Sequence, residues 1–189
     1  MDISEKELNE LISGCMNGKR SCQKKIYELF NKKMLYVCLR YSNDMSSAKD
    51  LMHDGFIKIF DKVENYNFSG SFEGWIRRIM VNNAIDQIRK NQKETIMEDD
   101  SYIFANMEGE EEEEDSLYDA LNLKPQDVMD AVQQLSPAYK AVFNMYVIEN
   151  FTHKEIADYL DISEGASKSN LAKAKRNLRQ ILSEKIKTV

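Results

Sequence analysis

Two helical patterns separated by only three residues lie near the C-terminus, and they constrain the fold more than any other feature of the sequence. The first covers residues 152–160 and opens with Thr152 and, three residues later, Glu155, which together match a capping box. The second covers about 164–185. Residues 161–163 leave room only for a tight turn, and Ser163 is expected to be the N-cap of the second helix. The segment is therefore predicted to be a helix-turn-helix.

The first turn of the second helix is small and polar, and basic residues follow it. Small side chains let a helix start lie close to a DNA groove, and Lys, Ser and Asn side chains can contact phosphates or base edges. The alternative is a helical hairpin with a solvated basic face, since Lys and Arg in a last turn also complement the helix dipole. The residues expected to contact DNA are Ala166, Ser167, Lys168, Ser169, Asn170, Lys173 and Arg176.

Helical patterns also fill most of the remaining chain. Apolar residues recur at i, i+3 and i+4 over residues 26–37, 51–63 and 75–88 in the front part, and over 128–135 and 141–146 in the rear part. Ser46 and Ser47 are expected to open the second of these helices, and the third is expected to run from about Phe72 to Lys90. Ser136 and Pro137 fit the N-cap and the first position of the last one. The clearest loop signal of the front part is residues 65–71. Two prolines and seven glycines are too few for the many turns of an all-β protein. The sequence therefore predicts an all-α fold.

The charge of the chain is segregated along its length. The net charge is −6, yet residues 94–125 hold twelve Asp and Glu against one Lys, a net of −11, which leaves +5 for the remainder. Six consecutive acids, residues 110–115, repel one another and oppose packing. We therefore expect two small helical domains, residues 1–93 and 126–189, joined by an acidic flexible linker over 94–125. The front domain is basic, and so is the C-terminal helix, since residues 164–189 hold seven Lys and Arg against two Glu. This distribution indicates a polyanionic partner.

Several classes of protein are disfavoured by the sequence. No run of about eighteen apolar residues occurs, and residues 1–10 are acidic, so we expect a cytoplasmic protein. His53 and His153 lack partners at metal-ligand spacing, and no nucleophile–base pair or Gly-rich phosphate loop is present. We expect no metal, no cofactor and no enzymatic activity. The odd number of cysteines predicts buried or half-buried thiols, without a disulfide framework, at Cys15, Cys22 and Cys38.

Three stretches of the sequence resemble regions of bacterial sigma factors. Ala48-Lys-Asp-Leu-Met-His-Asp-Gly-Phe-Ile-Lys-Ile-Phe60 resembles region 2.2, and Arg78-Ile-Met-Val-Asn-Asn-Ala-Ile-Asp-Gln-Ile-Arg89 resembles region 2.4. Residues 135–143, followed by the helix-turn-helix, resemble region 4. The order of the regions, with region 2, a linker without region 3 and then region 4, is similar to the extracytoplasmic-function (ECF) group of the sigma-70 family.

The resemblance implies that the chain binds core RNA polymerase and directs it to promoter DNA. In the family, region 2.2 meets the clamp helices of the largest polymerase subunit, which implies contacts by Asp50, His53 and Asp54. A solvated polar face is the alternative for these residues. The helix over 164–185 would bind the −35 element. The loop and the region 2.4 helix would bind an opened −10 element through Ser69, Gly70, Ser71, Arg77, Arg78, Asn82 and Arg89.

Three further side chains lie close to the expected −10 surface. We expect Phe72 and Trp75 to pack in the core rather than to stack on bases. Asp86 is expected to orient Arg89 or Arg78, because a free carboxylate would repel the phosphates of DNA.

The sequence departs from the family pattern at some of these positions. His53 stands where the family usually has Gln, and Ala166, Ser167 and Asn170 stand where Thr, Val and Arg are frequent. Many family members are held inactive by a membrane-bound anti-sigma factor, so such a partner is a further candidate for this chain. The acidic linker is either a solubilising tether or a segment that mimics nucleic acid near the RNA exit path.

Two other functions are left open by the sequence. A two-domain transcriptional regulator would bind DNA without polymerase, but it has no need of the patterns at 48–60 and 78–89. An interaction protein could present sigma-like surfaces to sequester a regulator. Such a mimic tends to lose its DNA-facing basic residues, whereas Lys168, Lys173 and Arg176 are present here.

Overall fold

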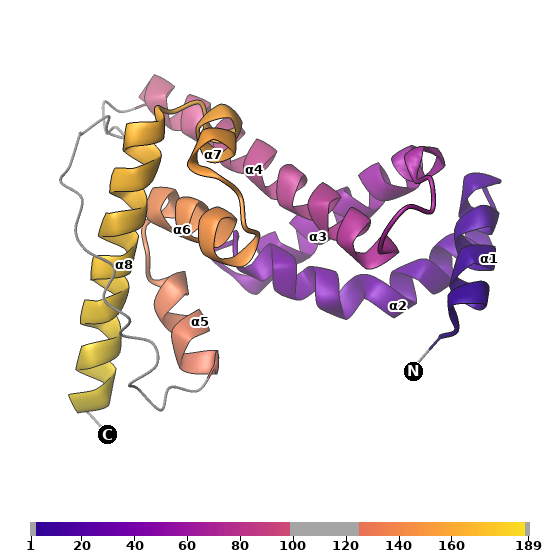
Figure 1. Ribbon diagram of the computed structural model, residues 1–189, viewed down its shortest axis with the longest axis horizontal. Helices are drawn as coiled ribbons and strands as arrows, with labels where there is room; N and C mark the ends of the chain where they lie inside the picture. Colours follow the sequence, from indigo (N-terminus) through magenta and orange to yellow (C-terminus); the bar gives the residue numbers. More distant parts are fainter. Residues whose placement is uncertain (1–2, 99–124, 188–189) are drawn as a thin grey trace. The chain divides into compact units, whose positions relative to one another are not determined.

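The computed structural model describes residues 3–98 and 125–187 of the 189-residue chain. Within these two ranges all regular structure is helical, which confirms the all-α prediction (Figure 1). The chain divides into two compact units, Met1–Asp86 and Gln87–Val189. Most of the acidic stretch that was expected to be a linker lies outside the described residues.

The first unit is built on a long helix that contacts the helices on both sides of it in the sequence. This helix, α2 (Arg20–Leu39), packs against α1 (Glu5–Met16) and α3 (Met45–Lys62). A 3₁₀ turn, η1 (Val63–Asn65), and a loop lead to α4 (Phe72–Glu98). The core holds large side chains that are almost completely buried, namely Ile12, Ile26, Met34, Ile59, Ile76, Met80 and Ile85.

Two helix ends of the first unit differ from the expectation. Asp44 caps α3, since its Oδ1 accepts a hydrogen bond from the backbone N–H of Ser47 at 2.8 Å, whereas the serines themselves were expected to open this helix. Helix α4 was expected to end near Lys90 and instead continues to Glu98. Residues 91–98 contain neither proline nor glycine, so nothing in the local sequence stops the helix.

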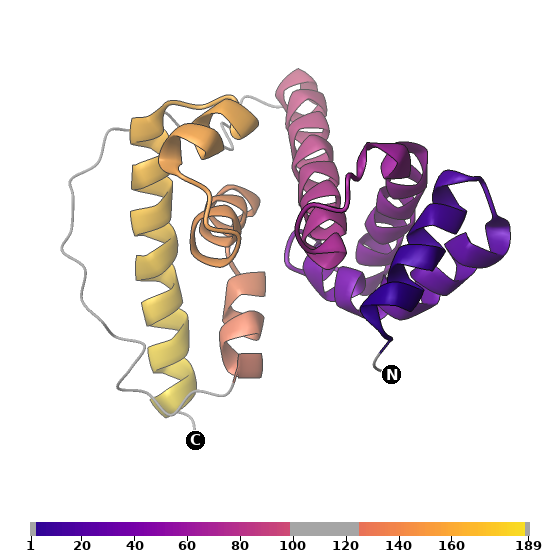
Figure 2. The ribbon, with the colours of Figure 1, turned by 45° about the vertical axis from the view of Figure 1, so that its right-hand side comes forward.

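The second unit packs three short helices against a long C-terminal helix, and a π-helical turn contacts two of the short helices. These elements are α5 (Pro125–Gln133), α6 (Pro137–Phe143), η2 (Asn144–Ile148) and α7 (His153–Leu160), and the long helix is α8 (Glu164–Lys187). Helix α8 contacts α5, α6 and α7 (Figure 2). As predicted, Pro137 occupies the first turn of α6, where the N–H that proline lacks would have no partner.

The cysteines and the hydropathy of the helices follow the sequence-based expectations. Cys15 and Cys38 are buried, Cys22 is half-buried, and all three are free thiols. Burial raises the pKa of the Cys15 thiol to about 11 and that of Cys38 to about 12, so both stay protonated and unreactive near neutral pH. No helix in the described part of the chain is long and apolar enough to cross a membrane.

Candidate functional site

The first candidate surface is the exposed face of α3. Asp50, His53 and Asp54 are all exposed and lie within one helical turn. The His53 Nε2 and the Tyr27 hydroxyl are 3.2 Å apart, and the two rings stack, which anchors the histidine to α2. Ile57, 60% exposed, continues the same face, because it lies four residues after His53 and three after Asp54. Ile57 was not predicted to be part of this surface, although an apolar side chain outside the buried stripe of α3 is visible in the sequence.

The second candidate surface begins in the loop before α4, where Ser69, Gly70 and Ser71 are all exposed. The Tyr66 hydroxyl donates a 2.7 Å hydrogen bond to the carbonyl of Gly70, which closes the loop. The Asn67 Oδ1 accepts a 3.0 Å hydrogen bond from the N–H of Ser69. Gly70 has φ +83°, a conformation that suits glycine. The loop is therefore held by its own side chains.

Aromatic side chains form the floor of this loop. Phe72 is 4% exposed, and its ring contacts those of Tyr66, Trp75 and Phe30 at centroid distances between 5.1 and 5.8 Å. Phe72 thus packs in the core, as expected, and half-buried Trp75 lies against it. Phe68 differs from them because it is 45% exposed.

Helix α4 carries the polar residues expected on the second surface. Arg78 is exposed, and Arg77, Asn82 and Arg89 are half-buried. The Oδ1 of Asn82 is buried and has no hydrogen-bond partner within the described residues. An unpaired acceptor of this kind costs free energy until a donor reaches it.

Two other polar residues of α4, Asn83 and Asp86, bind α4 to α3. Asn83 is buried, and its Nδ2 donates a 3.0 Å hydrogen bond to the carbonyl of Leu51. Among the described residues, Asp86 forms its ion pair with Lys58 at 3.3 Å, not with Arg78 or Arg89 as expected. Asp86 is exposed and the Lys58 side chain is 42% exposed, so solvent screens this pair and it contributes little to stability.

The third candidate surface is the helix-turn-helix formed by α7 and α8. The predicted capping box is present: the N–H of Thr152 donates to the Glu155 carboxylate at 2.8 Å, and the Thr152 hydroxyl accepts from the N–H of Glu155 at 3.2 Å. Asp161 ends α7 in the left-handed conformation. The Ser163 hydroxyl then accepts a 3.0 Å hydrogen bond from the N–H of Ala166, which caps α8 as predicted.

The residues of α8 that were expected to contact DNA differ in exposure. Lys168 and Arg176 are exposed and Lys173 is half-buried, whereas the other four, Ala166, Ser167, Ser169 and Asn170, are buried. This corrects the expectation that all seven are available at the surface. Ala166, Ser167 and Asn170 border the stripe of α8 that packs inward, since Asn170 lies four residues before buried Ala174.

Ser167 has a structural partner in α7. Its hydroxyl lies 2.9 Å from the Nδ1 of His153, and the His153 ring stacks on that of Tyr146 with centroids 4.5 Å apart. Ser167 therefore joins α7 to α8. Burial, followed by the positive charge of Lys168, lowers the pKa of His153 below its usual value of 6.5.

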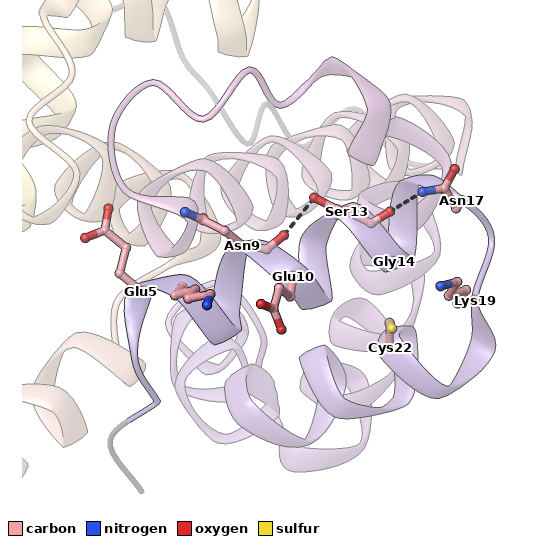
Figure 3. Close-up of a pocket in the computed structure, with 9 residues that line it drawn as sticks. Glu5, Asn9, Glu10, Ser13, Gly14, Asn17, Lys19 and Cys22 are labelled. Atoms are coloured by element: carbon pink, nitrogen blue, oxygen red, sulfur yellow. Dashed lines mark hydrogen bonds between the residues drawn. The ribbon is translucent and has the colours of Figure 1, made fainter.

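A polar groove along α1 lies outside all three surfaces (Figure 3). It extends from Glu5 to Cys22 at the start of α2. Gly14 lines the groove. A larger residue does not fit at this position, because an added Cβ would overlap the Sγ of Cys22. No residue predicted to be functional lines the groove.

Comparison with known proteins identifies both units. The model of sigma-70 region 2 matches residues 26–94, and that of sigma-70 region 4 matches residues 126–178. The chain is 28% identical over 151 residues to the ECF RNA polymerase sigma factor SigE of Mycolicibacterium smegmatis, a match that covers 78% of this chain and 56% of SigE. It is 23% identical to the ECF sigma factor SigW of Bacillus subtilis, over 94% of this chain and 98% of SigW.

Among solved structures, the sigma factor RpoE of Bartonella quintana, in complex with the anti-sigma factor NepR, is 21% identical and has a TM-score of 0.49. The match covers 85% of this chain and 96% of RpoE. The two sigma-70 models match successive parts of the chain in the order in which the sequence motifs occur. The protein belongs to the sigma-70 family of RNA polymerase sigma factors, in the extracytoplasmic-function group.

Proposed function

We propose that this protein binds core RNA polymerase and directs it to promoter DNA, where the opened −10 element and the −35 element are bound by different units of the chain. The observation that carries the proposal is the presence of both sigma-70 modules, in order, in one chain. The polymerase performs the chemistry, so the protein acts through binding surfaces alone, in the cytoplasm where the polymerase works.

The polymerase surface is assigned to α3, through Asp50, His53 and Asp54, with Ile57 added from the structure. The exposed isoleucine supplies apolar area that core polymerase would bury, and the carboxylates around it favour a basic partner. The bond between Tyr27 and His53 supports this assignment, because it holds the imidazole in place before binding.

The −10 surface is assigned to the loop and to α4. The exposed Ser69, Gly70 and Ser71 leave space for an unpaired base, and the arginines of α4 supply charge for the strand. Asn82 would use its unpaired Oδ1 to accept a hydrogen bond from an amino group of a base. The full set assigned to this surface is Ser69, Gly70, Ser71, Arg77, Arg78, Asn82 and Arg89.

The −35 surface is assigned to α8 as the helix that enters the major groove. Lys168, Lys173 and Arg176 would contact phosphates, since they are the exposed or half-buried cations of the predicted set. Base readout by Ala166, Ser169 and Asn170 would require their exposure in the complex.

The proposal is tested by run-off transcription with purified core polymerase on a library of promoter fragments, with and without this chain. We expect initiation at a defined subset of fragments. The Asp50→Ala/Asp54→Ala variant should lose binding to the core, and the Lys168→Ala/Arg176→Ala variant should lose promoter binding with core binding intact. Lys24→Ala, which removes an exposed charge on α2, is the matched control.

The alternatives give different results in the same assay. Binding of the chain to duplex DNA without stimulation of core polymerase would show a plain transcriptional regulator. Absence of binding to both core polymerase and DNA would point to the sequestering protein.

A further inference from the structure

His53 of α3 is held by a tyrosine of the neighbouring helix α2. The Tyr27 hydroxyl lies 3.2 Å from the Nε2 of His53, and the two rings stack with their centroids 6.2 Å apart. The Tyr27 ring also packs against that of Phe56 at a centroid distance of 4.8 Å. Phe56 is only 3% exposed, so half-buried Tyr27 is anchored to the core while its hydroxyl reaches the exposed histidine.

The second ring nitrogen of His53 is available to a partner. Its Nδ1 forms no hydrogen bond to any of the described residues, and the side chain is exposed. A neutral imidazole has one nitrogen that donates and one that accepts, and the hydrogen bond at one nitrogen decides the role of the other. When the Tyr27 hydroxyl donates to Nε2, the ring proton resides on Nδ1, which then donates to a partner.

The charges beside His53 favour this state of the ring. Asp50 precedes His53 by three residues and Asp54 follows it directly, and both side chains are exposed. The negative potential of the two carboxylates favours an N–H over a nitrogen lone pair on the side of the ring that faces away from Tyr27. The same carboxylates would repel an acidic group of a partner, so we expect the group that accepts from Nδ1 to be a neutral carbonyl oxygen.

We propose that Tyr27 is a positioning residue of the polymerase surface, which fixes the orientation and the protonated nitrogen of His53 so that Nδ1–H donates to a carbonyl oxygen of core polymerase. The inference rests on the proposed function and deepens it, because it adds a residue of α2 to a surface otherwise formed by α3. Tyr27 acts through His53 and needs no contact of its own with the polymerase. An imidazole that is held before binding has less side-chain entropy to lose in the complex.

The binding test measures the affinity of the full chain for purified core polymerase, by fluorescence anisotropy of a label on the N-terminal amine of the chain. Tyr27→Phe keeps the ring on Phe56 but removes the hydroxyl, and it should weaken binding by about 2- to 12-fold, the range for one hydrogen bond. In a His53→Ala background the same change should have no effect, because no imidazole remains to be positioned. Tyr36→Phe is the matched control, since Tyr36 is a 66% exposed tyrosine of the same helix, and it should bind like the wild type.

A second readout follows the imidazole directly. The chain has two histidines, so the ring nitrogens of His53 are identified in a ¹⁵N–¹H NMR spectrum by their loss in His53→Ala. At about pH 8, where histidine side chains are ordinarily neutral, His53 should carry its proton on Nδ1 in the wild type. Tyr27→Phe should lose this preference, whereas a purely structural role of Tyr27 would leave the tautomer of His53 unchanged.

Several outcomes would overturn the inference. Core affinity that is unchanged in Tyr27→Phe, or that falls equally with and without His53, would show that Tyr27 does not act through the histidine. A proton on Nε2 in the wild type would reverse the roles of the two nitrogens and rule out the Nδ1–H donor. Failure of the proposed function is distinguishable, because the wild type itself would then not bind core polymerase.

Discussion

Gly55 of α3 lies against the side chain of Met80 in α4, and replacing it with alanine tests how tightly these helices pack. A Cβ added at Gly55 would overlap the Sδ of Met80 and lie 3.0 Å from its Cε. Met80 is completely buried, so its side chain cannot move aside into solvent. Helix α3 carries the proposed polymerase surface and α4 carries part of the proposed −10 surface. The distance between these two helices therefore matters for function.

The expected change in stability is the sum of two opposing effects. Alanine is favoured over glycine inside a helix by about 1 kcal/mol. Overpacking a filled core costs roughly 1–3 kcal/mol, and we take about 2 kcal/mol here because the buried methionine is flexible but has little room to adjust. We therefore expect Gly55→Ala to destabilise the first unit by about 1 kcal/mol. Met80→Ala should cost about 2–5 kcal/mol, and the double variant should cost less than the sum by roughly 1–3 kcal/mol, because the added methyl group enters the cavity.

The assay is urea denaturation followed by fluorescence of Trp75, the only tryptophan of the chain, which lies in the first unit. Gly74→Ala is the matched control in α4, since its Cβ would meet only the Cβ of Ser71 at an ordinary 3.8 Å. This control should be stabilised by up to about 1 kcal/mol. Equal stabilisation by Gly55→Ala and Gly74→Ala, or additivity of Gly55→Ala with Met80→Ala, would refute the close approach of the helices.

Three further predictions concern the second unit. Thr152→Ala removes the capping box and should cost about 1 kcal/mol, measured by urea denaturation with circular dichroism. The pKa of His153 is lowered in the folded protein, so the free energy of unfolding decreases as the pH falls below about 6.5. The urea midpoint should therefore drop more between pH 8 and pH 5.5 in the wild type than in His153→Gln. Lys173→Ala and Arg176→Ala should each reduce the slope of log affinity for duplex DNA against log salt by about 1.

The sequence predicted the helices and their caps well where local chemistry decides the structure. The capping box at Thr152, the proline that opens α6 and the serine that caps α8 all follow from short-range hydrogen bonding, which a sequence displays directly. The length of α4 was underestimated because the end of a helix without proline or glycine leaves no local signal.

The side chains of the candidate surfaces were harder to predict, because exposure depends on contacts between elements. Ser167 is polar and was expected on the surface, yet it faces His153 across the helix pair. Asp86 was expected to pair within its own helix and instead reaches Lys58 of α3. The left-handed backbone of Phe68 could not be predicted either, since residue type alone does not reveal the Tyr66 hydroxyl bond that closes the loop.

The π-helical turn after α6 has a consequence for tolerance to changes in chain length. A π turn accommodates one residue more than an α-helical turn, and η2 follows directly on α6. Deleting one residue within 144–148 would therefore leave a continuous α-helix, whereas deletion inside α8 would rotate every later side chain by about 100° around the helix axis. Among the helical segments described in this unit, residues 144–148 are therefore where we expect a single-residue deletion to be accommodated best.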